Sequence, residues 1–357
     1  MPLIKNHRVF LELYDLGGKF RHRWETTDFR NCMADFRFSA FRQGLLPNDG
    51  SDPLITLKPL LTTPRGTNGN GFQLIVDLNG APFTKIYGQY IFRYEIRRVL
   101  MDLMKAGESL KDVDLKFRLI FLKESQNKSV SEEKVKQKFS FTAQHPKLPI
   151  VNRKLSTFLG KTTLHLNGHG NNGDFPVYVA EHVVQTMIEH SLKNKEREEA
   201  GFLSGYLCQD PDGGELFSIC TDQIVADGGA ERPVDETGCS VVQFQFSPEI
   251  FYHAQQIVAH RNKGETLLGW WHSHPWPFTC QKTDRCKCTS LFFSAADVEV
   301  MEAAFAAPYQ VAVVIGGAAE APKKAVPQMY GWRDGLMATR EFERFLEIER
   351  DNVHKNE

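Results

Sequence analysis

Short runs of alternating hydrophobic and polar residues, separated by turn signals, make up most of residues 1–125. Because successive side chains of a strand point to opposite faces, such runs predict half-buried β-strands. The predicted strands cover 8–14, 36–41, 72–76 and 115–122, and Gly17-Gly18 marks a turn after the first. One helix is predicted over 90–105, where hydrophobic residues recur at helical spacing. These elements predict an α+β N-terminal domain.

From Pro176 onward, helical and strand-like patterns follow one another more regularly. Helices are predicted over 177–192, from Ser247-Pro248 to about 263, over 295–305 and, with many charges, over 339–351. Strands are predicted over 201–207, 216–225, 242–246, 267–272, 309–315 and 328–332. Strands interleaved with helices predict a layered sheet domain.

The boundary between the two patterns is polar. Residues 123–137 (KESQNKSVSEEKVKQ) are charge-rich and poor in hydrophobic side chains, and 167–173 (NGHGNNG) predict a loop. We therefore divide the chain into residues 1–150 and 151–357. The first part shows no catalytic constellation, so we expect it to bind or position a partner.

Composition and charge narrow the class of protein. The 357 residues are 41% hydrophobic, and 43 basic against 44 acidic residues give a formal net charge of -1. Such a chain is globular and has no global field that would attract nucleic acid or an anionic membrane. The first residues, MPLIKNHRVFLELYD, carry charges where a signal peptide is apolar, and no hydrophobic run is long enough to span a membrane. A cytoplasmic protein is expected.

Two histidines at the end of a predicted strand carry the first chemical signal. In Gly269-Trp270-Trp271-His272-Ser273-His274-Pro275, the strand period of two puts His272 and His274 on one side. Downstream, Asp297 of Ser294-Ala295-Ala296-Asp297 opens a helix and offers a carboxylate. Three protein ligands with one open position are typical of a catalytic zinc.

An acid before another buried strand supplies the second signal. Glu198 starts the segment Glu198-Glu199-Ala200-Gly201-Phe202-Leu203-Ser204-Gly205. A carboxylate beside a metal-bound water can act as general base and later protonate a leaving amine.

Together these segments, ExxGxLxG, GWxHSHP and SxxD in that order, resemble the JAMM/MPN signature of metal-dependent deubiquitinases over roughly 175–350. The resemblance implies that His272, His274 and Asp297 bind zinc, that Glu198 activates the water, and that Ser294 helps hold the oxyanion. Its ExxG pattern favours Glu198 over the adjacent Glu199. It also implies a cytidine-deaminase-like α/β/α sandwich.

The N-terminal part is similar in arrangement to the region that accompanies bacterial JAB-type peptidases, including those of antiphage operons with ubiquitin-like conjugation. The implied activity is cleavage after the C-terminal glycine of a ubiquitin-like protein, by deconjugation or maturation. The implied partners are that modifier, its conjugates, and E1-like and E2-like enzymes, with neither nucleic acid nor membrane.

Ordinary structural roles compete with this interpretation. Two histidines at a strand end can be surface or core residues, and SxxD before a helix can be only a capping box, with Ser294 as N-cap. A non-catalytic MPN scaffold and a zinc peptidase for unrelated peptides are the alternative functions, because catalytic residues determine chemistry but not substrate.

The segment between His274 and Asp297 departs from the family spacing, which predicts an insertion at about 276–290. Its Cys280, Cys286 and Cys288 form a C-x5-C-x-C array, which is not a standard zinc spacing but offers three thiolates for a second, structural zinc, with Asp284 or a distant histidine as fourth ligand. Three independent reduced thiols are the alternative. The insertion also makes Asp284 a competitor of Asp297 at the catalytic site.

Three other features are expected to be mainly structural. Trp270 and Trp271 should alternate between the core and a cleft, where one could contact substrate. His165 and His169 lie in or beside a loop, and the basic residues 19–23 are expected to form a solvated turn.

Overall fold

The chain divides into two units, Met1–Lys147 and Leu148–Glu357, each built around its own β-sheet. The computed structural model describes residues 7–26, 28–50, 53–63, 66–78, 81–107, 115–123, 147–159, 164–165, 174–193, 198–226, 246–274, 291–318 and 321–346. No helix within these ranges is long and apolar enough to cross a membrane. The predicted α+β class is confirmed, and each unit is described by itself below.

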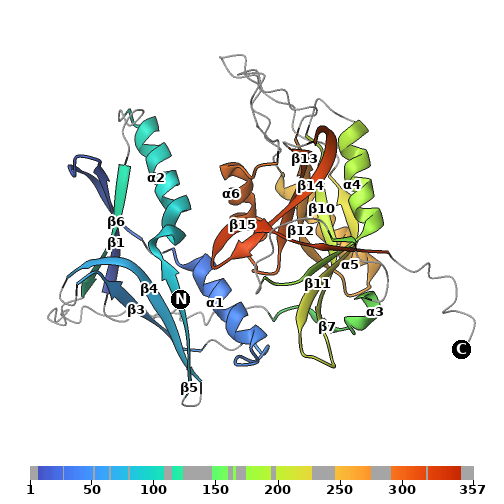
Figure 1. The fold of residues 1–357 in the computed structure, drawn as a ribbon, viewed down its shortest axis with the longest axis horizontal. Helices are drawn as coiled ribbons and strands as arrows, with labels where there is room; N and C mark the ends of the chain where they lie inside the picture. The colour runs from blue at the N-terminus through green and yellow to red at the C-terminus, as the bar shows by residue number, and fades with distance from the viewer. Residues whose placement is uncertain are drawn as a thin grey trace, which may run out of the picture. The chain divides into compact units, whose positions relative to one another are not determined.

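The N-terminal unit contains an antiparallel sheet of six strands and two α-helices (Figure 1). The strand order is β2-β1-β6-β4-β3, and β5 also pairs with β4. The strands are β1 (His7–Asp15), β2 (Phe20–Glu25), β3 (Ile55–Leu61), β4 (Asn68–Leu78), β5 (Ala81–Gly88) and β6 (Leu115–Lys123). The helices are α1 (Arg30–Arg42), the 3₁₀ turn η1 (Gln89–Phe92) and α2 (Arg93–Lys105).

Hydrophobic and polar residues alternate along the strands of this unit, and the hydrophobic ones form its core. Leu11, Ile55, Phe72 and Leu119 point to one side of the sheet and are fully buried, together with Phe36 of α1. Burying side chains of this size stabilises the unit by roughly 1.5 to 3 kcal/mol each. The polar side of the predicted strands faces away from this core.

Two predictions in this unit are wrong. Residues 36–41 were expected to form a strand but belong to helix α1, because Cys32, Phe36 and Ala40 recur every four residues and are all buried. Residues 19–23 were expected to form a turn, but Phe20 begins strand β2. Pairing with β1 leaves the basic side chains of β2 at least partly exposed, so their charge does not oppose strand formation.

A ten-stranded mixed sheet forms the centre of the C-terminal unit. Its order is β15-β14-β13-β12-β10-β11-β9-β16-β8, with β7 on β10. The strands are β7 (Ile150–Asn152), β8 (Leu164–His165), β9 (Val177–Ala180), β10 (Ala200–Gln209), β11 (Leu216–Val225), β12 (Thr266–Ser273), β13 (Val311–Ala318), β14 (Ala321–Arg333), β15 (Leu336–Arg340) and β16 (Glu343–Phe345). The helices are α3 (Ser156–Leu159), α4 (Glu181–Lys193), α5 (Pro248–Arg261) and α6 (Ala295–Ala304).

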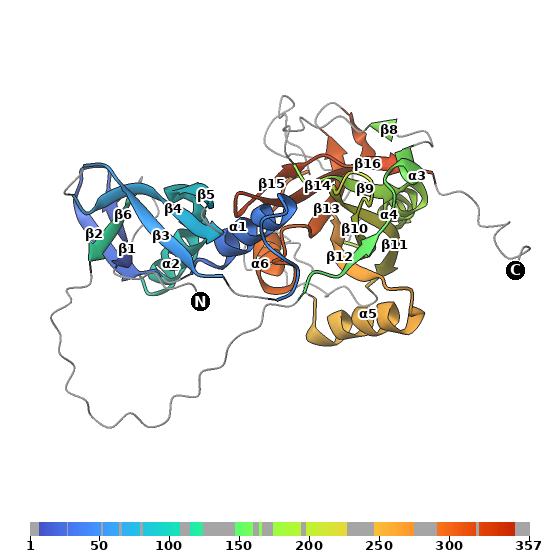
Figure 2. The same cartoon turned by 90° about the horizontal axis from the view of Figure 1, so that it is seen from below.

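Helices cover both faces of this sheet (Figure 2). The consecutive residues Trp270 and Trp271 on β12 point to opposite faces: Trp270 donates to Met301 Sδ of α6 at 3.3 Å, whereas the Trp271 ring lies 6.3 Å from that of His190 on α4. On the α6 face, Phe202 also contacts Phe251 of α5. The unit is therefore a three-layer α/β/α arrangement, as expected.

Two motif glycines are required by close backbone approach. A Cβ on Gly201 would lie 2.5 Å from the Ile224 carbonyl oxygen and 2.6 Å from Trp271 Nε1. A Cβ on Gly269 would lie 1.7 Å from the Val311 carbonyl oxygen. Since real Cβ atoms do not approach so closely, Gly201 allows β10 to lie against β11 and Trp271, and Gly269 allows β12 to lie against β13.

Two further predictions are wrong in the C-terminal unit. The predicted helix 177–192 starts as strand β9 and becomes helical only at Glu181, because Val177 pairs with Ser218 of β11. The predicted last helix 339–351 is replaced up to Phe345 by the end of β15 and by β16, which pairs with β9 and β8. The predicted linker 123–137, loop 167–173 and strand 242–246 lie outside the described residues, apart from Lys123 and Phe246.

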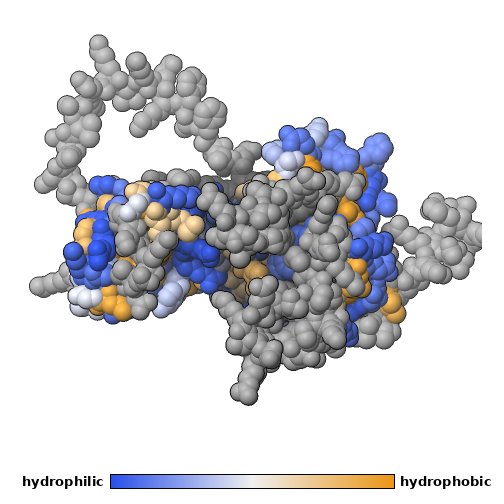
Figure 3. Space-filling model, turned by 90° about the horizontal axis from the view of Figure 1, so that it is seen from above, coloured by the Kyte–Doolittle hydropathy of each residue, from blue (hydrophilic) through white to orange (hydrophobic). Residues whose placement is uncertain are grey.

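Large hydrophobic side chains at the surface occur in both units. On the face drawn in Figure 3, hydrophobic residues form small separate groups among hydrophilic ones. Among all described residues, the most exposed large hydrophobic side chains are Tyr90, Tyr252, Ile86, Leu54 and Leu16. Scattered positions of this kind are ordinary and do not by themselves indicate a function.

Candidate metal centre

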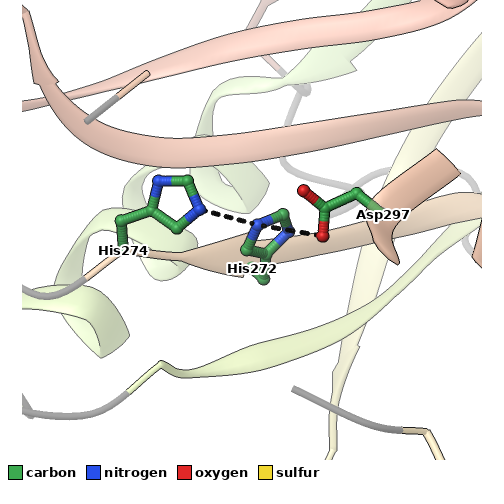
Figure 4. Close-up of side chains that lie close together, drawn as sticks. All are labelled: His272, His274 and Asp297. Atoms are coloured by element: carbon green, nitrogen blue, oxygen red, sulfur yellow. Dashed lines mark hydrogen bonds and ion pairs between the residues drawn. The ribbon is translucent and has the colours of Figure 1, made fainter. Parts of the chain in front are cut away.

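The two motif histidines leave the end of β12 on the same side and point toward each other. His272 Nε2 and His274 Nε2 are 3.2 Å apart, and both side chains are buried. Figure 4 shows the two rings with the carboxylate of Asp297 beside them. The strand period therefore places both imidazoles at one point, as predicted.

Asp297 is both a helix cap and a member of this cluster. Its Oδ2 accepts a hydrogen bond from the Ser294 backbone N–H at 2.6 Å, and Ser294 Oγ accepts one from the Asp297 N–H at 3.2 Å. This reciprocal pair is a capping box at the start of α6. The other carboxylate oxygen, Oδ1, lies 3.7 Å from His272 Nε2. The capping and ligand roles of Asp297 use different oxygens and are compatible.

The spacing of the three donor atoms fits a zinc ion. Ligand atoms of His272, His274 and Asp297 all lie within 4.8 Å of one another. Tetrahedral ligands at the usual zinc distances are separated by about 3.4 Å. The observed separations of 3.2 and 3.7 Å lie on either side of that value. Two nitrogens and one oxygen also match the donor set of catalytic zinc sites.

The electrostatic state of His272 suits a ligand. Burial lowers the pKa of His272 to about 4, the nearby Asp297 carboxylate raises it and His274 lowers it further. The ring is therefore neutral at pH 7, so its lone pair is free for a cation. The Trp270 ring stacks on it at 4.7 Å with an interplanar angle of 15°. Among the described residues, His272 Nδ1 is buried with no hydrogen-bond partner.

Aromatic residues lie beside His274 and beside the segment that leads into the N-terminus of α6. The Phe292 ring lies 4.5 Å from that of His274 and is 48% exposed, so it borders the site from the solvent side. Phe293 points the other way and stacks on Tyr330 at 4.7 Å. Tyr330 OH also donates to the Leu291 carbonyl at 3.3 Å. These contacts anchor the segment that presents Ser294 and Asp297.

Glu198 lies two residues before strand β10, whose first residue Ala200 pairs with His272. The last pair of the β10–β12 ladder joins Ala200 to His272, and the next residue of β12, Ser273, donates its N–H to the Glu199 carbonyl at 2.7 Å. With a strand period of two, Glu198 shares a face with Phe202, which packs against α5 and α6. His272 and Asp297 are on this same face. Glu199, the competing acid, is one residue further along the chain, so the same period predicts that it projects to the opposite side.

Several other predicted residues are placed differently or not described. Cys280, Cys286, Cys288 and Asp284 lie outside the described residues, so the second zinc remains a prediction. Trp270 and Trp271 are both buried, at 1% and 0% exposure, and the expectation that one of them lines a cleft is wrong. The reason is that helices cover both faces of β12. His165 lies in strand β8, and His169 is outside the described residues.

The sequence interpretation missed the aromatic surroundings of the site. Phe292 and Phe293 lie between the insertion and the SxxD motif, and two aromatic residues next to a ligand motif are a signal that could have been noted. Tyr330 gave no such signal, because its contact with residues 291 and 293 arises only from the position of β14 in the fold.

Comparison with known proteins gives the class of the C-terminal unit. Residues 180–328 match the family of prokaryotic homologs of the JAB domain. A JAB domain, preceded by a separate N-terminal region, therefore occupies this part of the chain, and the JAMM/MPN resemblance is confirmed. The matched segment contains His272, His274, Asp297 and Glu198.

No curated protein matches the chain. Among solved structures, one similar chain is the solution structure of protein DSY2949 from Desulfitobacterium hafniense. It is 19% identical, and the match covers 50% of this chain and 99% of that one with a TM-score of 0.33. At that score the likeness adds nothing to the family assignment.

Proposed function

We propose that the C-terminal unit is a zinc-dependent peptidase or isopeptidase. The observation that supports this most directly is the convergence of His272, His274 and Asp297 on one buried point, with ligand atoms within 4.8 Å of one another. Three protein ligands leave a position for water or substrate, whereas a structural zinc is closed by four.

The metal ligands and the residues around them have different roles in the proposed hydrolysis. A bound zinc would polarise the scissile carbonyl and lower the pKa of its water. Glu198 takes the proton from the attacking water and delivers it to the leaving amine. The Ser294 hydroxyl accepts from the Asp297 N–H, and since a hydroxyl also has a proton to donate, it can hold the developing oxyanion.

The substrate class proposed here is the C-terminal tail of a ubiquitin-like protein, cut after its last glycine. This proposal rests on the resemblance of the three sequence motifs to those of metal-dependent deubiquitinases, because the description of the matched family names no substrate. An extended, glycine-ended tail fits a mode in which the peptide pairs with a sheet edge beside the site. The N-terminal unit would bind the modifier, its target, or an E1-like or E2-like enzyme of a bacterial conjugation system in the cytoplasm.

The test is cleavage of two probes by the zinc-loaded chain. In one, a ubiquitin-like protein ending in Gly-Gly continues into a short peptide; in the other, the same glycine is joined to a lysine side chain. We expect cleavage after the glycine, measured by mass spectrometry. Glu198→Ala should lower kcat by on the order of 10³-fold while zinc stays bound, because only the general base is removed.

The matched control is Glu199→Ala, which removes the adjacent acid on the other side of the strand. We expect it to lose far less activity than Glu198→Ala. Cleavage that survives Glu198→Ala would refute the proposed mechanism. Zinc binding without cleavage of either probe would favour a non-catalytic scaffold, and cleavage of unrelated peptides alone would refute the substrate class.

A further inference from the structure

Ser273 lies between the two histidines and has no role in the chemistry assigned above. It is 1% exposed, although its side chain is polar. Its Oγ accepts a hydrogen bond from the Glu199 backbone N–H at 2.9 Å, and its own N–H donates to the Glu199 carbonyl at 2.7 Å. One residue of the ligand strand is thus bonded twice to the residue after Glu198.

This pair departs from a regular antiparallel ladder. Residues that face each other in a hydrogen-bonded pair normally exchange two backbone bonds, N–H to carbonyl in both directions. Here the Ser273 hydroxyl takes the place of its backbone carbonyl. Just beyond it, the His274 N–H donates to the Ile315 carbonyl of β13 at 2.9 Å. β12 lies between β10 and β13, so the His274 N–H points to β13 while the Ser273 N–H and hydroxyl both bond to the Glu199 backbone.

Glu198 lies one residue before the backbone groups that make this contact. Strand β10 begins at Ala200, whose partner is His272, so Glu198 and Glu199 extend past the regular ladder. Two hydrogen bonds with Ser273 join the Glu199 backbone to the ligand strand. A general base must lie within hydrogen-bond reach of the proton that it takes, so a shift of its backbone changes the rate directly.

We propose that Ser273 is a positioning residue whose hydroxyl holds the Glu198 backbone in register with the His272–His274 strand. The inference rests on the proposed function, in which Glu198 is the general base. It predicts an effect on the chemical step without an effect on metal binding.

The test compares Ser273→Ala and Ser273→Thr with wild type, all loaded with zinc. We expect Ser273→Ala to lower kcat on the peptide-extended ubiquitin-like probe by on the order of 10- to 100-fold, with KM and zinc affinity unchanged. Ser273→Thr restores the hydroxyl and should recover most of kcat. The control is Ser218→Ala, which removes a buried serine hydroxyl of the same sheet on β11 and should leave kcat unchanged.

A second measurement does not depend on cleavage. Hydrogen exchange of the Glu199 amide should be faster in Ser273→Ala than in wild type by on the order of tenfold, because its acceptor is gone. This change is expected even if neither probe is a substrate, which separates failure of this inference from failure of the proposed function. Wild-type kcat with unchanged Glu199 exchange in Ser273→Ala would overturn the proposal. So would loss of zinc, since Ser273 would then act through the ligands.

Discussion

Each unit of the protein buries a cluster of polar side chains, and the two clusters differ in how they are satisfied. In the N-terminal unit, Asp35 accepts a hydrogen bond from Tyr87 OH at 2.6 Å and pairs with Lys85 Nζ at 2.6 Å. Lys85 also donates to Ser39 Oγ at 3.1 Å. One negative and one positive charge neutralise each other there.

The cluster of the C-terminal unit is not closed in this way. It combines the Asp297 carboxylate with the neutral His272, and no lysine or arginine of the described residues pairs with Asp297. Burying polar groups without complete pairing is unfavourable. Burial of polar residues alone therefore does not indicate a metal site. A largely buried carboxylate without a lysine or arginine partner among the described residues does, because a metal cation can supply the missing positive charge.

The largest expected difference between the clusters is their response to zinc. Zinc at a thousandfold excess over its Kd should stabilise the C-terminal unit by about 4 kcal/mol, because the ion binds only the folded cluster. The N-terminal unit should not respond. Thermal unfolding with zinc and with a chelator, followed unit by unit, measures both effects.

Asp297→Asn is the matched variant for this comparison, since it keeps the side-chain shape and an oxygen for the cap. It should lose most of the zinc-dependent stabilisation. An equal zinc shift in wild type and Asp297→Asn would show that the ion binds elsewhere.

A smaller effect is expected from opening the closed cluster. Asp35→Ala removes the partner of a largely buried lysine, and it should lower the free energy of unfolding of the N-terminal unit by about 3 kcal/mol. Zinc binding should not change. Urea unfolding of wild type and variant gives the difference.

Asp102→Ala is the control for Asp35→Ala, because Asp102 forms a surface pair with Lys105 in which both side chains are more than 70% exposed. Exposed pairs contribute little, so this change should lie within about 0.5 kcal/mol of wild type. Equal effects of the two substitutions would remove the distinction between a structural cluster and surface charge.

The smallest expected effect is the pH dependence of the zinc-free protein. Burial lowers the pKa of His272 to about 4, so between its ordinary value and 4 the unfolded chain binds a proton that the folded chain does not. The free energy of unfolding should therefore decrease as the pH is lowered through that window, by on the order of 1 kcal/mol from pH 7 to pH 5.5. Thermal melts of chelated wild type and His272→Asn test this, and equal slopes would contradict it.

Much of the C-terminal unit could be predicted from the sequence, because its signals are local. The period of two placed His272 and His274 together, and the cap signature placed Asp297 at the start of α6. The N-cap serine and the following proline gave the start of α5. These features depend on neighbours within a few residues.

What could not be predicted depends on tertiary pairing. The run at 36–41 satisfies both strand and helix patterns, and only burial of one helical side against the sheet decides for α1. The charged segment after Thr339 has helical composition, but β16 pairs with β9 and β8, which are distant in sequence. The pair of hydrogen bonds between Ser273 and Glu199 likewise joins residues 74 positions apart.

The most direct test of the central claim is the location of zinc in crystals of the zinc-loaded chain, by anomalous diffraction at the zinc edge. We predict a peak at about 2.0 to 2.2 Å from His272 Nε2, His274 Nε2 and Asp297 Oδ1, with one coordination position not filled by protein. A peak at the cysteines of the insertion would independently support the second site. Absence of zinc from the His272–His274–Asp297 cluster, or a fourth protein ligand that closes it, would contradict the account.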